Sequence, residues 1–213
     1  MIKTKNIIII FIPALLILGI AIFIRILQYQ SIKPSPILEE EQNTELQIPI
    51  LSNDPILGNK KAPISIMVFE DFGCEGCRQQ MTILEKLLEK HEGKVKIIWK
   101  GLPVARFPYS SQSAHEHAFC ANQQENFAKF EQLAFSNSNN LSAEILNRIV
   151  DEIGLNKNKL QKCLNSGEAQ AYIKQTESLG LYLNIQSVPS IFIDNKQIQP
   201  PQILEGWETL LGL

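Results

Sequence analysis

The chain has 213 residues and a formal net charge of −2 at pH 7, with a predicted pI near 6.0. This near-neutral balance gives no basis for nucleic-acid binding, which usually needs a basic surface. The length allows one domain of ordinary size after a membrane segment and a tether are set aside. The four cysteines are even in number, which favours pairing if the protein leaves the cytoplasm.

An uncharged apolar run from Ile7 to Ile24 follows Lys3 and Lys5. As a helix, this run would extend about 27 Å, close to the hydrocarbon thickness of a bilayer. We therefore predict one transmembrane signal-anchor helix over residues 7–27. Residues 1–6 are expected in the cytoplasm, because positive charge favours that side. A cleaved signal peptide is the alternative, although no small-x-small cleavage site follows the run.

The stretch from 28 to 53 is polar, contains Lys33-Pro34-Ser35-Pro36 and the acidic triplet Glu39 to Glu41, and has no amphipathic period. We predict a tether here rather than a domain. A single folded domain is then expected over 54–213. The protein would be a single-pass protein of the cell membrane, with this domain outside the cytoplasm, in the periplasm or at the cell exterior.

The domain is expected to open with a turn, followed by a strand in which Ile64, Ile66 and Val68 share one parity. The strand breaks at Phe72-Gly73, and an amphipathic helix follows from Cys74. The apolar positions of this helix have three-and-four spacing: Met81, Leu84, Leu87 and Leu88.

Cys74 and Cys77 flank Glu75-Gly76 at the start of this helix. Unpaired N–H groups and the positive end of the helix dipole stabilise a thiolate there, which makes the first cysteine reactive. The second sulfur lies on the same helix face and can attack a disulfide formed by the first. The spacing favours dithiol/disulfide exchange. Half of a zinc site, or a short structural disulfide, are the alternatives.

The rest of the domain predicts a second strand, a long helical stretch and a final sheet segment. Gly93 ends the first helix, and the second strand would lie parallel to the first through a right-handed crossover. The expected elements are a strand at 94–100, helices at 110–135, 141–153 and 159–179, strands at 188–194 and 196–199, and a helix at 203–211. The fold class is therefore α/β, with an all-helical insertion at about 108–181.

Three motifs in this order resemble the DsbA-like thiol:disulfide oxidoreductases. They are Asp54-x-x-Leu57-Gly58 with Ala62-Pro63, Phe69-x-Asp71-Phe72-x-Cys74-x-x-Cys77, and Val188-Pro189 before an apolar strand. The resemblance implies a thioredoxin-like fold with a helical insertion and no cofactor. It also implies that Cys74 is the exposed nucleophile, Cys77 its buried partner, and Pro189 a cis-proline beside them. From the residues alone, a trans turn proline stays open.

A cis-proline would expose the backbone of Val188 beside the cysteines. An extended client segment could then form β-type hydrogen bonds there without sequence preference.

Two departures from the family pattern bear on reactivity. Many members have an acidic residue where this chain has Val68, and Glu70, two residues on, is expected to face the opposite side of the strand. Glu75-Gly76 also differs from the usual dipeptide. A carboxylate at Glu75, with Glu70 and Asp71 nearby, would disfavour a thiolate. We therefore expect a weaker oxidant than the strongly oxidising members, which equilibration with defined glutathione ratios would measure.

The second cysteine pair, Cys120 and Cys163, lies on two predicted helices of the insertion. By the resemblance, these residues form a structural disulfide, and two buried free thiols are the alternative. His115 and His117 lie near Cys120 but diverge by about 200° on a helix, so they cannot share one metal ion. No metal site is predicted.

The expected function is disulfide exchange with folding client proteins through Cys74 and Cys77, in the direction that introduces disulfide bonds. A membrane redox partner would then reoxidise the protein, and the N-terminal helix would contact the lipid bilayer. A reductase or isomerase of the same fold stays open, because residues do not set the direction. The remaining alternative is a membrane-tethered thioredoxin-fold module that binds without turnover.

Overall fold

The computed structural model describes residues 16, 18–25 and 47–213, and the chain divides into two units, Met1–Leu46 and Gln47–Leu213. In the first unit, residues 18–25 are helical. No helix within the described residues combines the length and the apolar character that a bilayer crossing requires. Most of the predicted membrane segment at 7–27, and the tether as far as residue 46, lie outside the described residues.

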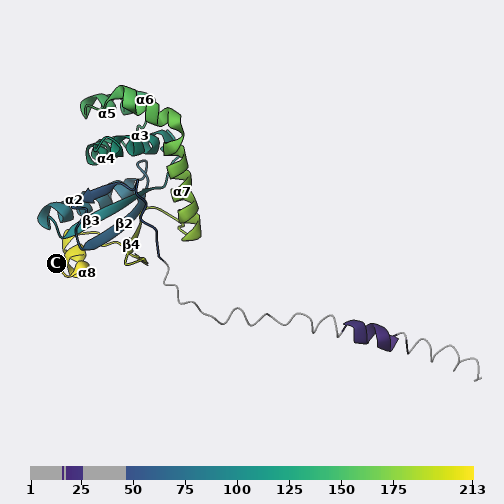
Figure 1. The fold of residues 1–213 in the computed structure, drawn as a ribbon. Coiled ribbons are helices and arrows are strands. Elements are labelled where there is room, and N and C mark those ends of the chain that lie inside the picture. The colour runs from purple at the N-terminus through teal and green to yellow at the C-terminus, as the bar shows by residue number, and fades with distance from the viewer. Residues whose placement is uncertain (1–15, 17, 26–46) are drawn as a thin grey trace, which may run out of the picture. The chain divides into compact units, whose positions relative to one another are not determined.

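The second unit is built on a five-stranded sheet in the order β1-β3-β2-β4-β5 (Figure 1). Its strands are β1 (Ile56–Gly58), β2 (Ile64–Glu70), β3 (Val95–Gly101), β4 (Ser190–Ile193) and β5 (Lys196–Ile198). The predicted crossover is present, because β2 and β3 are parallel and α2 (Glu75–Lys90) joins them. The other neighbouring strands are antiparallel. Sequence reasoning assigned β1 to a turn, since three residues are too few to show an alternating pattern.

The helical insertion contains more helices than the sequence predicts. It comprises α3 (Gln112–Asn122), α4 (Phe127–Ser136), α5 (Ala143–Glu152), α6 (Lys157–Ser166) and α7 (Glu168–Tyr182). The predicted helix at 110–135 breaks where Glu125 has φ 58°, and the one at 159–179 breaks where Gly167 has φ 80°. Left-handed backbone ends an α-helix, and glycine adopts it without steric cost.

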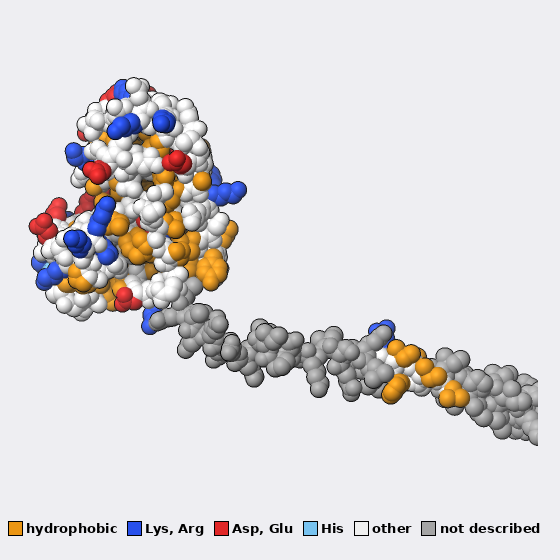
Figure 2. Space-filling view, viewed as in Figure 1, with side chains coloured by type: hydrophobic (Ala, Val, Ile, Leu, Met, Phe, Trp, Pro, Cys, Tyr) orange, Lys and Arg blue, Asp and Glu red, His pale blue; other side chains and the backbone are white. Residues whose placement is uncertain are grey.

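The two faces of the sheet are covered differently. Side chains of one parity, such as Ile66 and Val68 of β2, join the large core under α2, the insertion and α8 (Leu204–Leu211). The other parity, Met67 and Phe69, packs with Phe192 and with the end of α7. In Figure 1, α7 runs from the insertion along the side of the sheet. Hydrophobic side chains gather over the sheet and the lower part of α7 on the face drawn in Figure 2.

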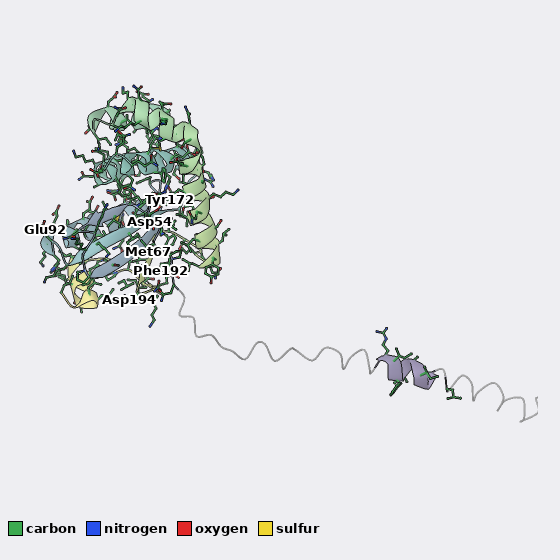
Figure 3. The ribbon with its side chains drawn as sticks, viewed as in Figure 1. Asp54, Met67, Glu92, Tyr172, Phe192 and Asp194 are labelled. Carbon is green, nitrogen blue, oxygen red and sulfur yellow. A yellow bond between two sulfur atoms is a disulfide. The ribbon has the colours of Figure 1, made fainter. Side chains whose placement is uncertain are left out.

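The packed unit begins at Gln47, before the predicted domain start at 54, because its first residues are attached to the sheet. Ile48 is buried, and its N–H donates to Asn195 Oδ1 at 2.8 Å. Asp54 and Lys100 form a fully buried ion pair at 2.5 Å. The hydroxyl of Tyr172 donates to the other oxygen of Asp54 at 2.9 Å, and the two residues lie close together in Figure 3.

Candidate active site

Cys74 and Cys77 are joined in a disulfide at the start of α2, with their Cα atoms 5.2 Å apart. Cys74 is the N-cap residue, and its sulfur accepts a hydrogen bond from the N–H of Cys77 at 3.1 Å. Cys74 is partly exposed, whereas Cys77 is completely buried. An incoming thiolate can therefore reach only the first sulfur, and the helix N-terminus would stabilise that sulfur as a leaving thiolate.

Asp71 holds the turn between β2 and α2 in place. Its backbone carbonyl accepts from the N–H of Cys74 at 3.0 Å, and its Oδ1 accepts from the N–H of Gly73 at 2.9 Å. Its Oδ2 accepts from the N–H groups of Val104 and Ala105 at 2.6 and 2.5 Å. A Cβ at position 73 would lie 2.5 Å from the Cβ of Ala105, so only glycine permits this close approach.

His115 is the second partner of Asp71. Its Nε2 lies 3.3 Å from Asp71 Oδ1, and both side chains are buried. Burial alone would raise the pKa of Asp71, but the hydrogen bond and charge of His115, with the N–H of Gly73, hold that pKa below its ordinary value. His117 instead bonds the carbonyl of Ser113, so the two histidines point to different partners. Within the described residues, no group of three or more His, Cys, Asp or Glu side chains could hold a metal ion.

The Val188-Pro189 peptide bond is cis, and it lies beside the disulfide. The Sγ of Cys74 is 3.6 Å from the carbonyl oxygen of Val188. A Cβ added at Gly76 would lie 3.5 Å from Pro189 Cδ and 3.9 Å from Cys74 Sγ. The tertiary structure thus brings together two segments that are more than a hundred residues apart. A second cis bond, Phe107-Pro108, was not predicted.

Glu75, between the two cysteines, points into solvent and pairs with Arg78. Arg78 Nε donates to Glu75 Oε2 at 2.8 Å, and Gln79 Nε2 donates to Glu75 Oε1 at 2.9 Å. These contacts lower the pKa of Glu75 to about 2. The carboxylate is ionised at neutral pH, and it neutralises the positive charge of Arg78, the nearest cation on this turn of the helix.

The predicted orientation of Glu70 is wrong, because side chains two positions apart in a strand share a face. Glu70 lies on the same side of β2 as Val68, facing Glu131 of α4 and Glu85 of α2, and it is completely buried. Burial raises the pKa of Glu70 well above its ordinary value, and the charge of Glu131 adds to this. This shift disfavours the charged form of Glu70, which weakens the electrostatic effect that we expected from this residue on the cysteines.

The buried Glu131 makes a pH dependence of stability testable. Burial raises its pKa to about 8 from 4.5, with a further contribution from Glu85. Between these pH values the folded state binds more protons than the unfolded state, so the free energy of unfolding falls as pH rises towards 8. This group can contribute at most about 1.4 kcal/mol per pH unit. We expect Glu131→Gln to flatten the decline between pH 5 and pH 8 in urea unfolding.

The matched control for this prediction is Glu152→Gln, an exposed position at the end of α5. It should keep the wild-type slope. An unchanged slope in Glu131→Gln would contradict the assignment of a neutral buried carboxyl at this position.

Cys120 of α3 and Cys163 of α6, which are 43 positions apart in the sequence, form a second disulfide with Cα atoms 5.8 Å apart. Both cysteines are buried. This bridge links two helices of the insertion.

Sequence reasoning missed residues that contact the site from other segments. Glu131 comes from α4, and this position has no local pattern that marks it. The loop at Val104 and Ala105 was also missed, because its contact with Asp71 is made across 33 and 34 positions. The recurrence of glutamine at 79, 80, 197, 199 and 202 is a signal that could have been noticed.

A family model described as thioredoxin matches residues 51–212. The chain belongs to the thioredoxin family. "Probable disulfide bond formation protein D" of Bacillus anthracis is 23% identical over 196 residues, which cover 87% of this chain and 90% of that protein. "Na(+)/H(+) antiporter NhaA 3" of Salinispora tropica is 22% identical over 163 residues, and the match covers 76% of this chain but spans only 25% of the antiporter.

Solved thioredoxin-fold structures are similar to the same region. A thioredoxin-like oxidoreductase from Silicibacter pomeroyi has a TM-score of 0.68 at 23% identity, over 76% of this chain and 92% of that one. The thiol-disulfide exchange protein alpha-DsbA2 from Wolbachia pipientis has a TM-score of 0.67 at 20% identity, over 76% and 87%. Together with the family model, these matches confirm the predicted thioredoxin-like fold.

Proposed function

We propose that this protein is an extracytoplasmic thiol:disulfide oxidoreductase that introduces disulfide bonds into client proteins. The observation that carries the proposal is the arrangement around Cys74. Cys74 is partly exposed and is the N-cap residue of α2. Its sulfur is bonded to the buried Cys77 and lies 3.6 Å from the carbonyl oxygen of Val188. The match to proteins named for disulfide bond formation supports the same activity.

The reaction proceeds in two exchanges. A client thiolate attacks the Sγ of Cys74, the bond to Cys77 breaks, and Cys77 leaves as a thiolate that takes up a proton. A second thiolate of the client then attacks the client sulfur of this mixed disulfide, and Cys74 leaves as a thiolate. The client has lost two electrons and gained a disulfide, and the protein holds two reduced cysteines. A redox partner in the membrane takes those electrons and restores the Cys74–Cys77 bond.

The surroundings of the cysteines favour a modest oxidant. The ionised Glu75 lies between the two sulfurs and engages Arg78, which leaves the Cys74 thiolate without a free cation on this turn. A less stable thiolate makes the reduced form of the protein less stable. The oxidised protein therefore has a weaker tendency to take electrons from clients. The N–H of Cys77 and the helix dipole are then the main stabilising groups.

The proposed location places the N-terminal segment at 7–27 in the cell membrane as a single-pass anchor, with residues 1–6 in the cytoplasm. The domain at 54–213 would lie outside. Support comes from the uncharged run Ile7 to Ile24 behind Lys3 and Lys5. An outer location also suits a protein with two disulfides, because such bonds persist in oxidising compartments.

Thiol trapping in intact cells tests two parts of the proposal together, the direction of disulfide exchange and the location of the domain outside the cytoplasm. Free thiols of the full-length protein are alkylated with a membrane-impermeant maleimide, with and without prior reduction. We expect Cys74 to react only after reduction, because a donor of disulfides is stored oxidised. A reactive thiol without reduction would indicate a reductant or isomerase, and labelling only after lysis would contradict the external location.

A further inference from the structure

A cleft of about 280 Å³ lies directly beside the cis-proline. Three segments form it: the start of α2 from Gly76 to Gln80, the residues from Ser187 to Ser190, and the chain from Gln197 to Gln202. The cleft therefore shares Val188 and Pro189 with the candidate active site. Any polypeptide held at Cys74 and Val188 would extend over this surface.

The cleft is lined by amide side chains and carries no charge. Five glutamines contribute to its wall, Gln79, Gln80, Gln197, Gln199 and Gln202, and none of its lining residues is ionisable. The apolar contribution is small, from residues such as Ile198 and Pro200. This composition differs from the mainly apolar lining that is usual for ligand pockets.

The hydrogen bonds of these amides are incomplete. Gln80 is 2% exposed, and its Nε2 has no hydrogen-bond partner within the described part of the chain. Gln197 Nε2 donates to Ser190 Oγ at 3.2 Å, and Gln202 Nε2 donates to the carbonyl of Pro200 at 3.0 Å. These bonds orient the two amides and leave their carbonyl oxygens as acceptors. A buried donor such as Gln80 Nε2 costs free energy until a partner reaches it.

We propose that this cleft binds an uncharged polar segment next to the reacting cysteine of the client, through hydrogen bonds with Gln80, Gln197 and Gln199. The inference rests on the proposed function and narrows the broad client range predicted from the sequence. A charged client residue would lose its hydration in a cleft that offers no counter-charge. A large apolar residue would leave the amides without partners.

The test uses the oxidised wild-type protein and four cysteine peptides of equal length. Their flanking residues are Gln and Ser, Leu, Glu, or Lys, and the rate of mixed-disulfide formation is measured for each at one pH with the concentration of thiolate matched. Wild type should react about fivefold faster with the Gln/Ser peptide than with each of the others, which corresponds to one or two net hydrogen bonds. Equal rates with all four peptides would overturn the inference.

Two variants locate the effect. Gln80→Met and Gln199→Met keep the size of the side chain and remove its amide, and each should reduce the preference for the Gln/Ser peptide to twofold or less. Gln199 is exposed, so Gln199→Met should fold even if Gln80→Met, at a buried position, does not. Gln170→Met, exposed on α7 and outside the cleft, should keep the wild-type preference. A preference that survives in Gln199→Met and Gln80→Met would also overturn the inference.

Failure of this inference and failure of the proposed function give different results. A protein that reacts with no peptide, and with no small thiol, lacks exchange activity altogether. A protein that reacts with all four peptides at the same rate is an oxidoreductase whose cleft does not select.

Discussion

Cys74→Ser should reduce the oxidation of a reduced, unfolded client to the rate measured without protein. Cys74 is the partly exposed residue of the pair, whereas Cys77 is completely buried. A serine hydroxyl cannot form the mixed disulfide, and the single remaining thiol cannot store the two electrons of the exchange. The measurement is the gain of client activity, or of client disulfide, over time with stoichiometric oxidised protein.

Cys77→Ser is the informative partner variant. It keeps the exposed Cys74 but has no second sulfur. When the Cys74 thiolate attacks a client disulfide, one client sulfur leaves as a thiolate and a mixed disulfide forms. No Cys77 thiolate is present to release the client, so this mixed disulfide should accumulate on non-reducing gels. Rates equal to wild type in Cys74→Ser would favour the non-catalytic binding module. Accumulation of mixed disulfides through Cys77 in the Cys74→Ser variant would reverse the assignment of the two sulfurs.

Asp54→Ala should lower the free energy of unfolding by about 3–5 kcal/mol, because it leaves a buried lysine without its counter-charge. Asp54 Oδ2 accepts from Lys100 Nζ at 2.5 Å and from the N–H of Leu51 at 2.6 Å, and Oδ1 accepts from Tyr172. The remaining partner of Lys100 would be the carbonyl of Pro49 at 2.9 Å. Burial lowers the pKa of Lys100 even with Asp54 present, so loss of the lysine proton limits the cost.

Asp151→Ala provides the matched control, because Asp151 pairs with Lys157 at 2.5 Å on the surface, with both side chains more than half exposed. Exposed pairs contribute about 0–1 kcal/mol. Urea unfolding of both variants at one pH makes the comparison. A loss below about 1 kcal/mol in Asp54→Ala would mean that the buried pair does not attach the first residues of the domain to β3 and α7.

Local sequence patterns are sufficient to identify the reactive cysteine pair and the strand and helix on either side of it. Cys74 and Cys77 are three positions apart, and the alternating and three-and-four patterns on either side of them are local, so the strand, the helix and their junction follow from short-range rules. The parallel pairing of β2 and β3 follows as well, since a helix between two strands requires a crossover. The break at Glu125 in the predicted helix at 110–135 could not be predicted from the sequence, because no local pattern marks a non-glycine residue with positive φ.

The surroundings of the two sulfurs, in contrast, depend on contacts between segments that are distant in sequence. Four features of the site show this dependence. They are the cis isomers of the prolines, the contact of Val188 with Cys74, the hydrogen bonds from Val104 and Ala105 to Asp71, and the burial of Glu70 near Glu131. Burial then changes the chemistry of a residue type, since the loss of hydration raises the pKa of a carboxyl that is ionised in water. Long-range packing has no local periodicity, and for that reason the cleft of glutamines appears only when α2, β5 and the cis-proline segment are folded together.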